Sequence, residues 1–70
     1  MGMSFKARQI KAMHEVIRMG NDENIYMSWI NVVPDEPTDD DFEEIAADKD
    51  QYNEVVDKFI KLVSLKSFRA

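Results

Sequence analysis

Apolar residues recur at helical spacing along most of the chain, and this period limits the fold more than any other feature of the sequence. It is cleanest in residues 49–65, where one broad stripe is apolar and the opposite face carries charged and amide side chains. The stripe is formed by Tyr52, Val55, Val56, Phe59, Ile60, Leu62 and Val63. The spacing therefore predicts a helix over 49–65 that anchors the core.

The N-terminal segment 4–19 has a second apolar face. This face contains Ile10, Met13, Val16 and Ile17, with Phe5 near its edge. The next two residues, Gly20 and Asn21, tolerate the left-handed backbone that closes helices, so they predict the helix end. His14 lies at the border of the apolar face, and we expect it to be a partly buried structural residue.

Two further segments carry start signals for helices. Asp22 is placed to cap a helix over 22–33, which ends at Pro34 because proline cannot continue a helix. Thr38 is placed to cap a short helix over 39–47, whose first turn is acidic and therefore favoured by the helix dipole.

The composition indicates one small domain. A chain of 70 residues is long enough for a single thin core, and an apolar fraction of 44% is ordinary for a globular protein. The absence of cysteine fits a reducing compartment, so we expect a cytoplasmic protein. The fold prediction is all-α, a compact bundle of three to four short helices in a single domain over 1–70, with 1–4 and 66–70 as candidates for disorder.

Charge is distributed unevenly along the chain. Residues 34–57 hold eleven acidic residues against Lys49 alone, a balance of −10, whereas residues 1–20 and 58–70 carry balances of +3 and +4. Concentrated charge of one sign steers and selects a partner of the opposite sign. We therefore predict that the acids around the third helix dock a basic protein partner. The predicted partner-binding residues are Asp35, Glu36, Asp39, Asp40, Asp41, Glu43 and Glu44.

Three alternatives compete with this docking face. The acids are also suited to solvating a thin helical domain and capping its helices. In a second alternative their carboxylates stand in for phosphates, and the protein is a nucleic-acid mimic that inhibits a DNA- or RNA-binding protein. In a third the protein is structural or homo-oligomeric, with a homodimer formed by apolar residues off the main stripes, such as Met27, Leu65 and Phe68.

The sequence offers little for catalysis, so we predict that the protein is not an enzyme and has neither a metal site nor a cofactor. His14 is its only histidine, and no cysteine completes a zinc site. An EF-hand loop starting at Asp39 has Glu44 where glycine is needed and Asp50 where the bidentate glutamate belongs. Glycine-rich phosphate loops are also absent.

Two other partner classes are not expected. A sequence pI near 4.6 argues against direct nucleic-acid binding, which needs a basic stripe. No apolar run approaches the roughly 20 residues that span a bilayer, so we expect no membrane association.

Three segments, Asn21–Ile30, Val33–Phe42 and Ile45–Ala46, resemble short uncharacterised proteins encoded by phages and prophages of Gram-positive bacteria. The likeness covers roughly residues 14–63, and its motifs are mostly helix caps and core positions. Small acidic phage proteins often bind and modulate host or phage proteins. The resemblance therefore implies a phage or prophage accessory factor that acts by protein–protein interaction, and it brings no catalytic residues.

Overall fold

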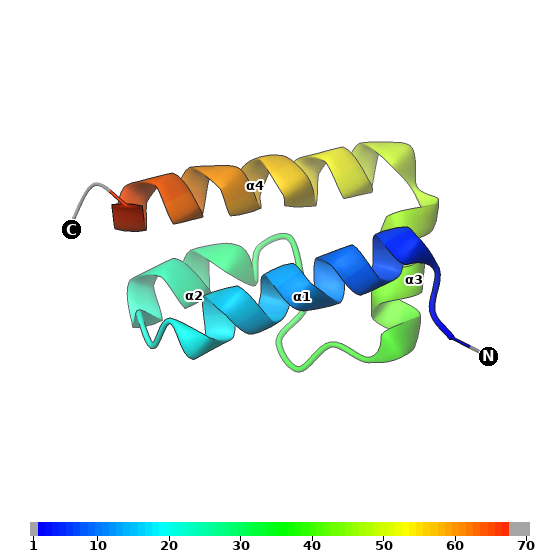
Figure 1. Ribbon diagram of the computed structural model, residues 1–70, viewed down its shortest axis with the longest axis horizontal. Coiled ribbons are helices and arrows are strands. Elements are labelled where there is room, and N and C mark those ends of the chain that lie inside the picture. The colour runs from blue at the N-terminus through cyan, green and yellow to red at the C-terminus, as the bar shows by residue number, and fades with distance from the viewer. Residues whose placement is uncertain (1, 68–70) are drawn as a thin grey trace.

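The computed structural model describes residues 2–67 and contains four helices. They are α1 (Phe5–Met19), α2 (Glu23–Trp29), α3 (Asp39–Ala47) and α4 (Lys49–Ser67). No strand occurs in residues 2–67, which confirms the prediction of an all-α bundle. Helices α1 and α4 run in the same direction along the long axis, α3 lies across one end, and α2 lies toward the other (Figure 1).

Side-chain caps begin the first three helices, two of them as the sequence predicts. The Ser4 hydroxyl accepts the Ala7 N–H at 3.2 Å, and Asp22 Oδ1 accepts the Ile25 N–H at 3.1 Å. Thr38 starts α3 with a reciprocal capping box that also uses Asp41. Each cap satisfies an N–H that the helix itself leaves unpaired.

Helix α1 ends in a turn made by Asn21. Asn21 adopts the left-handed conformation with φ 58°, whereas Gly20 keeps a right-handed helical φ of −69°. Asparagine tolerates this conformation, so the chain turns at Asn21.

Helix α2 is shorter than predicted, and this part of the sequence prediction was wrong. The α-helix stops at Trp29, and the next residues form a tight turn in which the N–H groups of Val32 and Val33 both donate to the Trp29 carbonyl. The residue before a proline is disfavoured in helical conformation, so Val33 must leave the helix ahead of Pro34. Val33 is nevertheless fully buried, because the turn directs it into the core.

All four helices contribute to one core. Its buried members are Ala7, Ile10, Ile17, Ile25, Trp29, Val33, Phe42, Ile45, Val55 and Leu62. Val16 and Ile60, which the periodicity placed on the apolar faces, are 54% and 57% exposed. The predicted stripes are therefore wider than the surface that neighbouring helices cover.

Two side-chain contacts of Tyr52 connect α4 to α1. The Tyr52 hydroxyl donates to Gln9, and Lys6 Nζ lies 4.8 Å from the centre of the Tyr52 ring, so the starts of α1 and α4 are joined.

Met27 and Leu65 are exposed, as predicted. The prediction for Phe68 lies outside the described residues. Of the segments 1–4 and 66–70 predicted as candidates for disorder, residues 1 and 68–70 also lie outside them, whereas Ser4 caps α1 and residues 66–67 belong to α4.

Candidate functional site

The acidic residues of the predicted docking face do not form one surface. Three of them are engaged in bonds that hold α3 in place, two project from α3 without such bonds, and Asp35, Glu36 and Asp39 border pockets beside α1. The structure therefore divides a set that the sequence treats as one.

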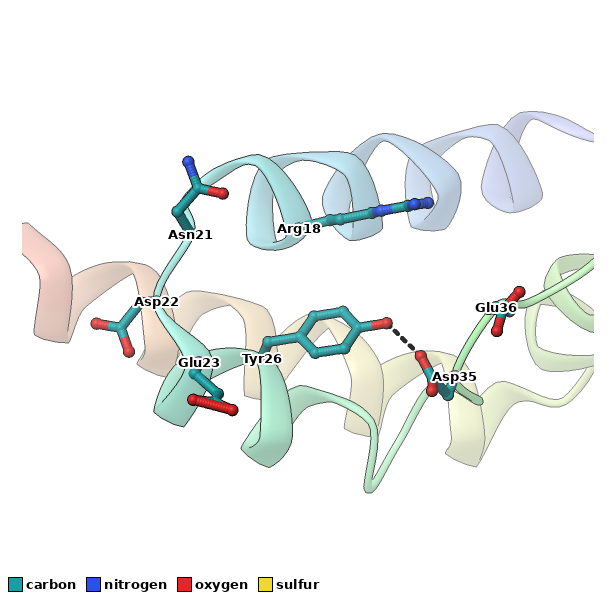
Figure 2. Close-up of a pocket in the computed structure, with 7 residues that line it drawn as sticks. All are labelled: Arg18, Asn21, Asp22, Glu23, Tyr26, Asp35 and Glu36. Atoms are coloured by element: carbon teal, nitrogen blue, oxygen red, sulfur yellow. Dashed lines mark hydrogen bonds between the residues drawn. The ribbon is translucent and has the colours of Figure 1, made fainter.

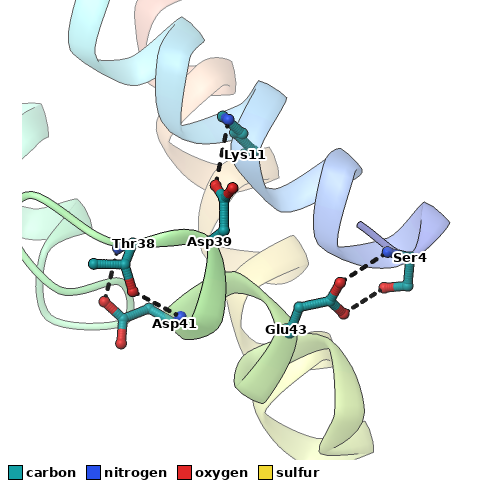
Figure 3. A network of polar contacts seen from close by, with 6 residues as sticks. All are labelled: Ser4, Lys11, Thr38, Asp39, Asp41 and Glu43. Atoms are coloured by element: carbon teal, nitrogen blue, oxygen red, sulfur yellow. Dashed lines mark hydrogen bonds and ion pairs between the residues drawn. The ribbon is translucent and has the colours of Figure 1, made fainter. Parts of the chain in front are cut away.

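Three α3 carboxylates serve the packing of α3 itself (Figure 3). Asp41 accepts the Thr38 N–H at 2.8 Å, and the Thr38 hydroxyl accepts the Asp41 N–H at 3.2 Å. Glu43 accepts both the backbone N–H and the hydroxyl of Ser4, each at 2.9 Å. Asp39 pairs with Lys11 at 3.4 Å, so the basic N-terminal helix folds back over part of the acidic segment.

Asp40 and Glu44 are the α3 acids whose side chains make no bond to the rest of the described residues. They lie four residues apart, hence on the same face of the helix, and neither has a hydrogen bond or ion pair within the described residues. Both side chains are exposed, so they form a solvated acidic face of α3.

A pocket of about 440 Å³ lies between the end of α1, the start of α2 and the loop that follows α2 (Figure 2). Its lining contains four carboxylates and one guanidinium. The residues are Arg18, Asn21, Asp22, Glu23, Tyr26, Asp35 and Glu36. We call this the first pocket.

One hydrogen bond fixes the shape of the first pocket. The Tyr26 hydroxyl donates to Asp35 Oδ1 at 2.5 Å, and Arg18 extends from α1 in the same direction as the Tyr26 ring (Figure 2). This bond to a carboxylate raises the pKa of Tyr26 above its usual value of 10.0, because the carboxylate stabilises the protonated phenol. The loop is thereby tied to α2, and the Tyr26 ring forms an aromatic wall.

Glu36 occupies an unusual position in this loop. Its φ is 53°, in the left-handed region that a glutamate enters only at a cost of order 1 kcal/mol. The side chain is exposed and borders the first pocket as well as a second one. Pro34 and Pro37 stand on either side of the Asp35–Glu36 pair and stiffen the turn.

The second pocket, of about 360 Å³, lies between α1, residues 36–39 and α3. It shares Arg18 and Glu36 with the first, so the two pockets are adjacent, and together we call them the acidic groove. The groove is bordered by six carboxylates, on Glu15, Asp22, Glu23, Asp35, Glu36 and Asp39, and by the basic groups of Lys11 and Arg18. Six negative and two positive charges give a local balance of −4.

His14 lines the second pocket and is more deeply buried than the sequence predicts. It is 3% exposed, and its Nδ1 accepts the Trp29 indole N–H at 3.0 Å. The ring is therefore neutral, with its proton on Nε2. Burial lowers the pKa of His14 below the usual 6.5. Nε2 has no hydrogen-bond partner within the described residues, an arrangement that costs about 1–3 kcal/mol.

The sequence indicated some members of the acidic groove and missed others. Asp35, Glu36 and Asp39 were predicted, whereas Asp22 appeared only as a cap and Glu23 fell outside the acidic segment. The proline-bracketed turn was visible, but its position against α1 was not. No short-range pattern shows that residues 35–36 pack beside Arg18 and Tyr26.

Within residues 2–67, no group of three or more histidine, aspartate and glutamate side chains is placed to hold a metal ion. None of the helices in this described part combines the length and apolar character needed to cross a membrane. Comparison of the chain with protein-family models, curated proteins and solved structures found no match.

Proposed function

We propose that this protein acts by protein–protein interaction and docks a basic segment of its partner in the acidic groove. The observation that supports this proposal most directly is the first pocket, where four carboxylates and one guanidinium surround a concavity large enough for a lysine or arginine side chain.

The chemistry of the groove suits a basic side chain. Tyr26 supplies an aromatic face for the apolar stem or the charged head, and the surrounding carboxylates accept hydrogen bonds from an ammonium or guanidinium. The bond between Tyr26 and Asp35 holds the wall in place before binding, which reduces the entropy lost when a partner is ordered.

The groove is a better candidate than the exposed face of α3. Asp40 and Glu44 offer charge on a convex helix surface, where ion pairs are weak and screened by salt. In the groove, charge is combined with concavity and an aromatic wall. We therefore place the docking site at the first pocket, with Glu23 and Glu36 as its least constrained carboxylates.

A charge-reversal pair tests this placement. In one variant Glu23→Lys and Glu36→Lys reverse the groove, and in the matched control Asp40→Lys and Glu44→Lys reverse the exposed face of α3. Both variants change the net charge from −5 to −1, so a difference between them reports location and not total charge.

The measurement has two stages. The wild-type protein captures partners from a Gram-positive bacterial lysate, and the affinity of each purified partner for both variants is then measured by calorimetry. We expect at least a tenfold loss for the groove variant and a smaller, salt-sensitive loss for the control. Equal losses, or a larger loss for the control, would contradict the groove as the docking site.

Nucleic-acid mimicry is a special case of the same interaction. A mimic competes with duplex DNA or RNA for its captured partner, whereas a docking protein that uses a separate surface binds at the same time as the nucleic acid. The competition is measured with the captured partner and a labelled duplex.

A further inference from the structure

The His14 ring brings a buried hydrogen-bond donor to the second pocket. Trp29 donates to Nδ1, so the ring proton is on Nε2, and this N–H has no partner within the described residues. Buried polar groups are nearly always paired with protein or water. An unpaired N–H at a pocket wall therefore points to an acceptor supplied from outside the chain.

The bond to Trp29 fixes the orientation of the histidine ring. The two ring nitrogens point in diverging directions, and Trp29, which engages Nδ1, lines neither pocket. His14 does line the second pocket, together with Phe42, whose ring centre is 6.0 Å from that of the histidine. The edge of the ring that bears Nε2 therefore lies on the side away from Trp29.

An acceptor reaches Nε2 only when the pocket wall moves, because the atom itself is closed to solvent. Lys11 and Asp39 border the pocket with side chains that are 47% and 67% exposed, and their ion pair is long at 3.4 Å. Exposed pairs of this kind contribute little stability, so they yield readily to an incoming group.

The charges around the second pocket select the kind of acceptor. Glu15, Glu36 and Asp39 border it together with Lys11 and Arg18, a local balance of −1, so a phosphate or a carboxylate meets a small excess of like charge. A carbonyl oxygen accepts the same hydrogen bond without this repulsion. The two pockets share Arg18 and Glu36 in their walls and are therefore adjacent, so one extended peptide segment is long enough to reach both.

We propose that the second pocket binds a main-chain carbonyl of the peptide segment whose basic side chain occupies the first pocket, with His14 Nε2–H as the donor. This inference rests on the proposed function, because it assigns a second contact to the same bound segment. It makes the groove selective for a cation attached to a peptide backbone over a cation alone.

Two probes separate these contacts in the wild-type protein. N-acetyl-lysine N-methylamide carries the cationic chain and two carbonyl groups, whereas pentylamine carries the cationic chain alone. Binding is followed by NMR through the backbone amides of Glu23 and Glu36 and through the ring nitrogens of His14, which is the single histidine. We expect both probes to shift the two amides, and only the peptide probe to shift Nε2 and slow the exchange of its proton.

The affinities provide a second readout. One neutral hydrogen bond corresponds to roughly two- to tenfold tighter binding of the peptide probe than of pentylamine. His14→Asn retains an acceptor for Trp29 but lacks Nε2, so it should bring the ratio of the two affinities, measured on that same variant, close to one. If that variant does not fold, the wild-type Nε2 signal decides the question.

The outcomes distinguish the two proposals. If both probes shift the groove amides while Nε2 stays unchanged, the carbonyl subsite is overturned and the docking site stands. If neither probe perturbs Glu23 or Glu36, the groove does not bind basic segments, and both proposals fail.

Discussion

The indole N–H of Trp29 donates to Nδ1 of His14 across 3.0 Å, and both side chains are buried. The bond joins α1 to α2 and fixes the histidine in its neutral form, because a protonated Nδ1 has no lone pair to accept with. The rings of Tyr26 and Phe42 lie 6.2 and 6.0 Å from the histidine ring and help to enclose it. The core therefore contains one group whose protonation opposes folding.

The free energy of unfolding should fall as the pH decreases below 6.5. Burial, the largest influence, holds the pKa of folded His14 below that value, and Arg18 acts in the same direction against Glu15 and Asp35. Between the folded and unfolded pKa values the unfolded chain binds a proton that the folded chain refuses, so stability is full above 6.5 and is lost below it. The slope, at most about 1.4 kcal/mol per pH unit, is measured by urea unfolding between about pH 5 and 7.

A variant without the imidazole identifies the source of this slope. His14→Asn keeps an acceptor for Trp29, and its stability should be nearly independent of pH over the same window. If the variant shows the wild-type slope, groups other than His14 are responsible.

Thr38→Ala should destabilise the protein by about 1 kcal/mol, within a range of roughly 0.5–2. The change removes the hydroxyl that accepts the Asp41 N–H and so opens the capping box of α3. Urea unfolding measures the loss, with Glu44→Ala on the exposed side of α3 as the control. The control should change stability by less than about 0.5 kcal/mol, and equal effects of the two changes would argue against the cap.

Glu36→Gly should be more stable than Glu36→Ala, by about 1 kcal/mol. Both changes remove the same carboxylate, but only glycine relieves the strain of a φ of 53°, and this relief exceeds its greater freedom in the unfolded chain. Thermal and urea unfolding of the two variants give the difference. A more stable alanine variant would mean that the left-handed conformation is not maintained in solution.

Asp35→Asn should lower the pKa of Tyr26 toward its usual value of 10.0. The carboxylate raises that pKa because it accepts a hydrogen bond from the phenol and repels the phenolate, and an amide removes the charge. The titration is followed by ultraviolet absorbance in a Tyr52→Phe background, where Tyr26 is the one remaining tyrosine. An unchanged Tyr26 titration would show that the bond to Asp35 does not form in solution.

The sequence by itself determined the helices and most of their boundaries. The apolar stripe of residues 49–65 has a single helical reading, and Asp22 and Thr38 cap helices through bonds that reach only three residues along the chain. Such signals act between residues that are close in the sequence, so the sequence of the segment is sufficient to predict the helix. The early end of α2 was the exception. It depends on the conformational restriction of the residue before Pro34 and also on the turn after Trp29, which buries Val33 in the core.

Tertiary structure alone decided which polar residues meet. His14 lies only 15 residues from Trp29, yet their bond depends on how α1 and α2 pack, and Glu43 reaches Ser4 across 39 residues. The acidic groove has the same origin, because residues 35–36 come from a loop that packs beside Arg18 and Tyr26. Charge along a sequence gives the amount of acid in a segment, whereas packing determines which carboxylates cap helices, which face solvent and which border a pocket.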